Sequence, residues 1–266
     1  MTTPLIDTHC HLDFPIFESD REAVLERARD VGIEAIVVPG VAPADWPRLQ
    51  SLCGRSWIGP SLLPAFGIHP FVVPKLGQQD VRSALLTLDS DYAPRGRAVG
   101  ECGLDGSTAR RPGGEMSRQL QILDAQMAVA ERVGVPLVLH IHRAHEPMVR
   151  FLKERGGCSV PMVFHSFSGS IEHIKRYLDY DAYFGFGGAV TRPNARRPHV
   201  AVRAVPIDRL LLETDAPDQT PHAHRGQRNE PAFVLEIAQG IAAILERSLE
   251  EISALTSANA RRVFGG

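Results

Sequence analysis

Eight short segments of this chain are rich in aliphatic and β-branched residues and are bounded by glycine or proline, which predicts strands. They are Leu5–His11, Ile33–Gly40, Leu63–His69, Ala98–Gly103, Val135–His142, Val160–Phe167, Tyr183–Val190 and Arg209–Thr214. Most of these segments contain a continuous apolar run, as in AIVVP, PLVLH, PMVFH and RLLLE, and do not alternate between apolar and polar residues. A parallel strand that is covered on both faces needs this pattern, because neither face meets water.

Helical patterns fall between several of these segments. Ser19 and Glu22 have capping-box spacing ahead of a helix that Gly32 would end, and Ser117 is expected to cap a helix that ends before Gly134. Further helices are predicted over Pro147–Arg155, Ser170–Leu178 and Pro231–Leu245, with a last cap formed by Ser248 and Glu251. The segments Gln50–Leu62 and Asp218–Asn229 are expected to be loops.

Strands that alternate with helices along the whole chain imply βα units. Eight such strands favour an α/β fold of the closed (β/α)8 TIM-type barrel. The 266 residues divide into about 33 for each unit, close to the size of one strand with its helix and loops. A single domain over residues 1–266 is therefore expected.

The charge balance excludes one class of protein. The chain has 29 Lys and Arg against 31 Asp and Glu, a net charge of −2, which argues against binding nucleic acid through a broadly basic surface. It has no apolar run of membrane-spanning length, and its first residues lack the pattern of a signal peptide. Its four cysteines form no CxxC pair and are expected to be reduced thiols. A cytoplasmic protein is expected, with no membrane association and no obligate protein partner.

Histidines and carboxylates gather at the carboxyl ends of the predicted strands, where barrel enzymes build their active sites. These residues are His9, His11, His69, Glu101, His140, His165 and Asp215. A lone histidine is more often a core or surface residue than a ligand. Here His9 and His11 are two apart in a predicted strand, so both would face the barrel mouth. Imidazole and carboxylate together favour a site for Zn, Mn or a similar divalent ion.

The number of candidate ligands favours two ions. Four histidines with Glu101 and Asp215 are too many for one tetrahedral ion. An unpaired buried carboxylate at Glu101 would be costly, and a position between two cations would remove that cost. Asp215 has two interpretations, since it can cap a helix ahead of Ala216 and Pro217 or serve as both ligand and catalytic base.

The ordered motifs DTHCHLD, GIHP, GECGLD, the HxxxA segment His140–Ala144, FHSFSG, LLLETDAP and RNEP cover the chain from Asp7 to about Phe264. In this order and spacing the chain resembles the TatD-like metal-dependent hydrolases of the amidohydrolase superfamily. The resemblance implies a TIM-type barrel with two divalent ions, Mg, Mn or Zn. It also implies hydrolysis, often as a DNase with 3' to 5' exonuclease character.

The resemblance assigns roles to individual residues. The first metal site would comprise His9, His11, Glu101 and Asp215, and the second would comprise Glu101, His140 and His165. Asp215 would accept a proton from the attacking water. His69, in the GxHP motif, would lie beside the metals and contact a phosphate oxygen or the leaving group.

The sequence departs from the family pattern in its substrate loops. His142 stands where the family usually has Arg, with Arg143 one place later, and Gly106 and Asp218 stand where aromatic residues are usual. A histidine offers phosphate a weaker and pH-dependent charge. His142, Arg143 and Arg228 are the expected substrate contacts, although Arg228 would alternatively pair with Glu230.

Other basic residues lie near the expected barrel mouth. They are Arg192, Arg196, Arg197 and Arg225, and either phosphate binding or an ordinary solvated face would explain them. The leading hypothesis is a two-metal phosphodiesterase or deoxyribonuclease that acts on DNA. The first alternative is an amidohydrolase or esterase for a small molecule or an aminoacyl ester. The second is a metal-binding scaffold subunit without catalysis.

Overall fold

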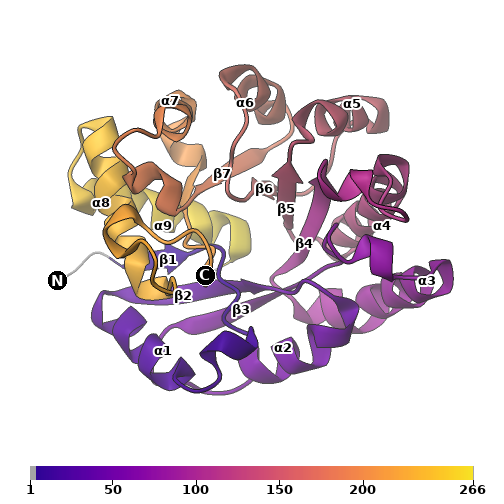
Figure 1. Cartoon of the computed structure of the whole chain (residues 1–266), viewed down its shortest axis with the longest axis horizontal. Helices are drawn as coiled ribbons and strands as arrows, with labels where there is room; N and C mark the ends of the chain where they lie inside the picture. The colour runs from indigo at the N-terminus through magenta and orange to yellow at the C-terminus, as the bar shows by residue number, and fades with distance from the viewer. Residues whose placement is uncertain (1–3, 266) are drawn as a thin grey trace.

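The computed structural model describes residues 4–265, in which eight parallel strands form a barrel with helices outside it (Figure 1). Each strand pairs with the next, from β1 to β8. The strands are β1 (Leu5–Asp7), β2 (Ile33–Pro39), β3 (Ser61–Phe66), β4 (Ala98–Asp105), β5 (Leu137–His142), β6 (Met162–Phe164), β7 (Ala182–Phe186) and β8 (Leu210–Leu212). The predicted (β/α)8 barrel is confirmed.

The barrel closes through the segments that follow β8 and β1. The Thr8 amide donates to the Leu212 carbonyl over 2.9 Å, and the Asp215 amide donates to the His9 carbonyl over 2.8 Å. Cys10 forms a parallel bridge with Ala216. The two chain segments that carry three of the predicted ligands are thus tied together by backbone hydrogen bonds.

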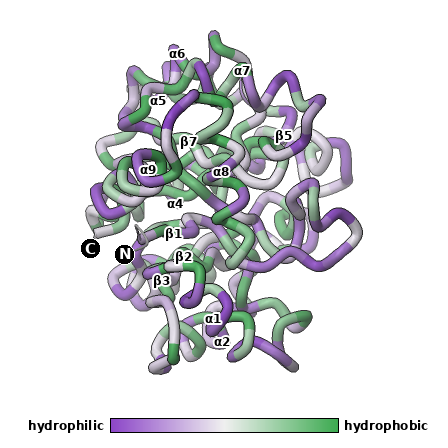
Figure 2. The backbone as a smooth tube through the Cα atoms, turned by 90° about the vertical axis from the view of Figure 1, so that its left-hand side faces the viewer, coloured by the Kyte–Doolittle hydropathy of each residue, from purple (hydrophilic) through white to green (hydrophobic). Residues whose placement is uncertain are grey.

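Helices cover the outer face of the strands. They are α1 (Arg21–Asp30), α2 (Trp46–Cys53), α3 (Gln78–Thr87), α4 (Met116–Val133), α5 (His145–Arg155), α6 (Ile171–Leu178), α7 (Arg196–Ala204), α8 (Val234–Leu245) and α9 (Leu249–Phe264). The strands contribute apolar side chains to two clusters of buried residues. Figure 2 shows hydrophobic and near-neutral stretches through the middle of the molecule, with hydrophilic stretches prominent in the outer loops. None of the helices in the described residues is long and apolar enough to cross a membrane.

One end of the barrel is filled by α9. Val263 and Phe264 pack with Ile6, Val138 and Leu211, which face the barrel interior. These apolar side chains occupy the amino-terminal part of the barrel, so only the carboxyl end is left open for polar groups. The fold thereby places the histidine-rich ends of the strands around one cavity.

Two predicted helix caps are wrong. The residue before α1 is Asp20 and not Ser19, and Glu115 precedes α4, so Ser117 lies inside the first helical turn. The predicted cap at Ser248 is confirmed, because its hydroxyl accepts the Glu251 amide hydrogen, and Ser170 caps α6 in the same way. A serine at capping distance therefore caps a helix only where the helix begins at the residue that follows the serine.

Three helices are absent from the sequence prediction. They are α2, α3 and α7, and residues 50–53 of the expected loop Gln50–Leu62 belong to α2. Proline lies in the first turn of both α2 and α7, where a missing amide hydrogen costs little. Most of the strands are also shorter than expected, and the chain that carries the polar residues continues beyond them as loops.

Candidate metal centre

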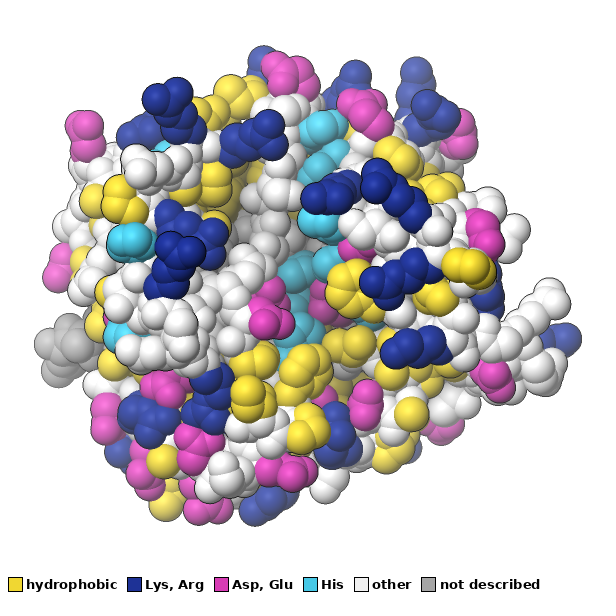
Figure 3. Space-filling view, in the orientation of Figure 1, with side chains coloured by type: hydrophobic (Ala, Val, Ile, Leu, Met, Phe, Trp, Pro, Cys, Tyr) yellow, Lys and Arg dark blue, Asp and Glu magenta, His cyan; other side chains and the backbone are white. Residues whose placement is uncertain are grey.

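A cavity of about 340 Å³ opens at the carboxyl end of the barrel. Five predicted ligands line it: His11, Glu101, His140, His165 and Asp215. The sixth, His9, is fully buried beside them. In the space-filling view, histidine side chains form the floor of a hollow, and arginine and lysine side chains stand around its rim (Figure 3). The structure therefore brings all six predicted ligands to one place.

His9 and His11 converge although they do not lie in a strand. Because β1 ends at Asp7, the strand geometry expected for these residues is wrong. The extended segment paired with Ala216 still directs both side chains inward, and their Nε2 atoms are 3.3 Å apart. Their convergence comes from the closure of the barrel.

Four donor atoms surround a space that fits one ion. The Nε2 atoms of His9 and His11 lie 3.4 and 3.5 Å from Glu101 Oε2, and each lies 3.6 Å from Asp215 Oδ1. A tetrahedral ion with bonds of about 2.1 Å separates its ligand atoms by about 3.4 Å. The donor spacing therefore fits a divalent metal.

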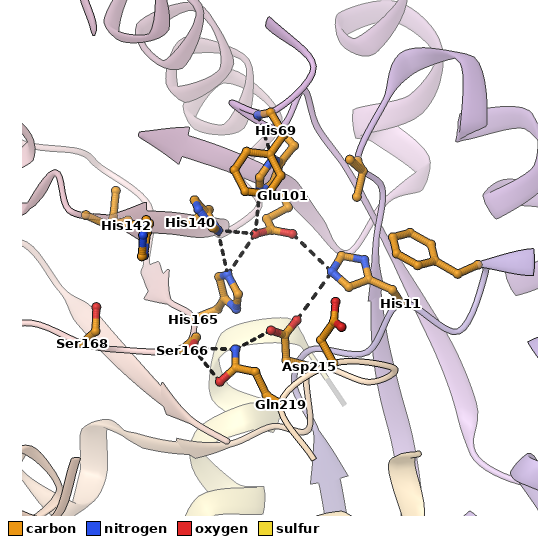
Figure 4. Close-up of a pocket in the computed structure, with 15 residues that line it drawn as sticks. His11, His69, Glu101, His140, His142, His165, Ser166, Ser168, Asp215 and Gln219 are labelled. Carbon is orange, nitrogen blue, oxygen red and sulfur yellow. Dashed lines mark hydrogen bonds and ion pairs between the residues drawn. The ribbon is translucent and has the colours of Figure 1, made fainter. Parts of the chain in front are cut away.

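The other oxygen of Glu101 faces a second set of histidines. Its Oε1 lies 2.9 Å from His165 Nε2 and 3.1 Å from both His69 Nε2 and His140 Nδ1. His140 Nδ1 and His165 Nε2 are 3.3 Å apart. Figure 4 shows Glu101 between His11 on one side and His140 with His165 on the other. One carboxylate thus joins two groups of possible ligands.

An irregularity in β4 directs Glu101 into the barrel. Val99 pairs with Leu137 and Cys102 with Leu139, so three residues of β4 match two of β5. This bulge shifts the alternation of side chains. As a result, Ala98 lies in the interior core and Glu101, three residues later, lines the cavity.

Glycine allows the backbones of β4 and β5 to approach at the centre. Gly103 has a φ of +133°, and a Cβ atom there would lie 2.1 Å from the His140 carbonyl oxygen. Any larger residue would therefore push β4 away from the strand that carries His140. The glycine in the GECGLD motif keeps Glu101 and His140 within contact distance.

The protonation states of Glu101, His9 and His11 suit metal binding. Burial alone would raise the pKa of Glu101, but His69, His165 and His9 outweigh it and hold that pKa well below its usual range. Burial also lowers the pKa of His9 well below its usual value and that of His11 to about 4. A carboxylate and neutral imidazoles are the forms that bind a cation.

Comparison with known proteins identifies the family of this chain. The family model described as TatD related DNase matches residues 6–265. The chain belongs to this TatD family. Its buried donors and its family together identify it as a metal-dependent hydrolase.

Individual relatives cover nearly the whole chain. The uncharacterized metal-dependent hydrolase YabD of Bacillus subtilis is 36% identical over 98% of this chain and 98% of its own length. The crystal structure of YjjV, a TatD homologue from Escherichia coli, superimposes with a TM-score of 0.88 at 31% identity, covering 100% of both chains. The 3'-5' ssDNA/RNA exonuclease TatD of Erwinia amylovora is 29% identical over 98% of this chain and 100% of its own length.

Three residues that the sequence analysis did not assign support the ligands of this TatD-family centre. Asp105 contacts His140 over 3.1 Å, and Gln219 donates to Asp215. The fully buried Glu213 accepts the Ser166 amide hydrogen and lies 3.7 Å from His165. Asp105 and Glu213 belong to the GECGLD and LLLETDAP motifs, which made them candidates. Their spacing in the sequence did not indicate that they would contact His140 and His165.

The predicted substrate residues lie in different settings. His142 lines the cavity, whereas the exposed Arg143 and the half-buried Arg228 are not among the described residues that line it. Arg228 donates to Asp20 over 2.6 Å and lies over the ring of Phe17. The expected pair between Arg228 and Glu230 is wrong, because Glu230 binds Arg27 over 2.7 Å.

Proposed function

We propose that this TatD-family hydrolase is a phosphodiesterase that removes nucleotides from the 3' end of single-stranded DNA with two divalent ions. The observation that carries the proposal is the division of the two Glu101 oxygens between two ligand sets. The relative from Erwinia amylovora, a 3'-5' ssDNA/RNA exonuclease, supports the choice of substrate.

In this proposal His9, His11, Glu101 and Asp215 hold one ion, and Glu101, His140 and His165 hold the other. Mg, Mn or Zn ions bound there would activate water and offset the charge on the attacking and leaving oxygens of a phosphodiester. Carboxylate and imidazole ligands accept all three metals, so availability and geometry select among them.

Asp215 is placed to act as the proton acceptor. Burial raises its pKa to about 7, and a cation held beside Oδ1 would lower that pKa and keep the carboxylate ionised. Gln219 donates a hydrogen bond to Oδ2, while Oδ1 faces His9 and His11. The two oxygens therefore have different surroundings, one held by the amide and the other directed to the ligand set.

His69 is suited to donate a hydrogen bond as a neutral imidazole. The Phe71 amide donates to its Nδ1 over 3.0 Å, so Nε2 carries the hydrogen. That Nε2 points to Glu101 Oε1, and burial lowers the pKa of the ring. When cations occupy the Glu101 oxygens, this hydrogen is available to a phosphate oxygen or to the leaving group.

One observation favours the second candidate, hydrolysis of a small-molecule ester, such as an aminoacyl ester, or of an amide. Among the described residues that line the metal cavity there is no Lys or Arg, and Asp218 lines it at its exposed mouth. A carboxylate at the mouth attracts an ammonium group and repels a phosphate. A free α-amino group on the substrate would meet Asp218 here.

A substrate panel distinguishes these functions. Purified protein would be given 5'-labelled single-stranded DNA, aminoacyl esters and simple amides, each with Mg, Mn or Zn and again with a chelator. We expect stepwise shortening of DNA from the 3' end that the chelator stops.

Two variants control the panel. Glu101→Ala should lose the activity, and Glu154→Ala, an exposed substitution on α5, should keep it. Hydrolysis of esters or amides without DNA cleavage would support the second candidate instead. Silence on every substrate would support a scaffold role.

A further inference from the structure

A second cavity lies directly beside the metal cavity. It has a volume of about 560 Å³, and Ser168 lines both cavities. The segment between β6 and α6 separates them, with Ser166 and Ser168 on the metal side and Ser168, Gly169 and Ser170 on the other. Figure 4 shows Ser166 near the ligands and Ser168 farther from them. We call this second cavity the α6–α7 groove, because residues of those two helices line it.

The wall shared by the two cavities is firmly held. The Ser166 amide donates to Glu213, and the Phe167 amide donates to the Gly185 carbonyl over 3.0 Å. The Ser166 hydroxyl also contacts Gln219, which binds Asp215. A ligand that occupies both cavities would therefore lie across this hydrogen-bonded segment between β6 and α6.

The α6–α7 groove carries positive charge that no carboxylate neutralises by direct contact. Arg196 and Arg197, in the first turn of α7, line it and are exposed. Within the described residues neither forms an ion pair, whereas Arg27, Arg155 and Arg228 all do. Glu172 is the one carboxylate among the described lining residues, which leaves the groove with a net positive charge.

Apolar side chains lie beside these arginines. Ile171 and Val200 line the groove and are 37% and 48% exposed, so their apolar side chains are accessible to a ligand. His145 also lines it, with its ring stacked on that of His173 at 4.8 Å between centroids. Guanidinium groups next to apolar and aromatic surface are the combination that binds the phosphates and bases of single strands.

We propose that the α6–α7 groove holds the nucleotides that precede the 3'-terminal nucleotide of a single-stranded substrate. Arg196 and Arg197 bind their phosphates, and Ile171 and Val200 contact their bases. The inference rests on the proposed function, since the 3' end would occupy the metal cavity. The α6–α7 groove also supplies the positive charge that the lining of the metal cavity lacks.

A binding experiment tests the groove without catalysis. Fluorescein-labelled (dT)10 would be titrated with the protein in a chelator, and its anisotropy followed at several salt concentrations. The double substitution Arg196→Ala with Arg197→Ala should raise the Kd about tenfold at low salt and lower the salt slope by about 1.4, since two phosphate contacts are lost.

A matched double variant controls for net charge. Arg82→Ala with Arg203→Ala removes two exposed arginines that line neither cavity, and it should bind (dT)10 as the wild type does. Equal affinities for the two double variants would overturn the proposal.

Kinetics with two substrate lengths separate this inference from the proposed function. The wild type should have a lower KM for (dT)10 than for the dinucleotide dTpdT, because only the longer strand reaches the groove. The groove variant should lose this difference and keep its kcat on dTpdT, which also shows that it is folded. An equal rise in KM for both lengths would overturn the groove, and a wild type that cleaves neither would overturn the proposed function with it.

Discussion

Asp105 Oδ2 lies 3.1 Å from His140 Nε2, while His140 Nδ1 lies 3.1 Å from Glu101. Burial alone would raise the pKa of Asp105, but hydrogen bonds from His140 and the Thr108 amide hold it well below its usual range. The ionised Asp105 therefore accepts the Nε2 hydrogen of His140 and holds the ring with Nδ1 directed toward Glu101 and the second ligand set.

We expect Asp105→Asn to weaken metal binding, because its amide no longer fixes this tautomer. Loss of such a supporting carboxylate lowers metal affinity by about 10- to 100-fold. Competition with a coloured chelator measures the metal Kd directly. Asp179→Asn, an exposed substitution at the end of α6, is the control and should bind metal normally. An unchanged affinity in Asp105→Asn would show that Asp105 does not act through His140.

Divalent ions should stabilise the folded chain. The donor atoms around Glu101 come together only when the chain is folded. A cation therefore binds the folded state more tightly than the unfolded state. At about 100 times its Kd a bound ion contributes about 2.7 kcal/mol, which corresponds to a Tm increase of roughly 5–10 °C for a chain of this size. Thermal unfolding in chelator, followed by addition of Mg, Mn or Zn, measures the shift. A Tm that does not respond to any of them would contradict a metal site.

Gln219→Ala should lower kcat more than it changes KM. Gln219 donates to Asp215 and contacts the Ser166 hydroxyl, so its loss would free the proposed proton acceptor to rotate. We expect kcat to fall about tenfold, which corresponds to one lost hydrogen bond of about 1.4 kcal/mol. Gln227→Ala, an exposed change in the same loop, serves as the control. A change in KM alone would assign Gln219 to substrate binding.

The half-buried His145 should make stability depend on pH. Burial, with His173 nearby, lowers its pKa to about 4, below the value near 6.5 of an unfolded chain. The folded state therefore loses stability as the pH falls from about 6.5 toward 4, by about 2 kcal/mol at pH 5 from this group. His145→Gln should remove that part of the pH dependence. Urea unfolding of both proteins at pH 5 and pH 8 measures it, and parallel pH profiles would exclude this role.

The sequence by itself determined the barrel and the chemistry at its mouth. Continuous apolar runs such as residues 35–39 (AIVVP) favour burial on both faces of a strand, which a barrel with outer helices provides. Histidines and carboxylates at the ends of these segments then had to meet, because parallel strands end on one side. These inferences use only local composition and the direction of the chain.

The tertiary structure decided how the ligands are arranged. If side chains simply alternated from Ala98 onward, Glu101 would point away from the barrel interior. The bulge opposite Leu137 and Leu139 reverses this orientation. His9 and His11 meet because hydrogen bonds to Asp215 and Ala216 close the barrel, and not because of strand periodicity. Asp105, Glu213 and Gln219 gain their roles only from neighbours on other strands. Such pairings depend on register between distant segments, which no local pattern contains.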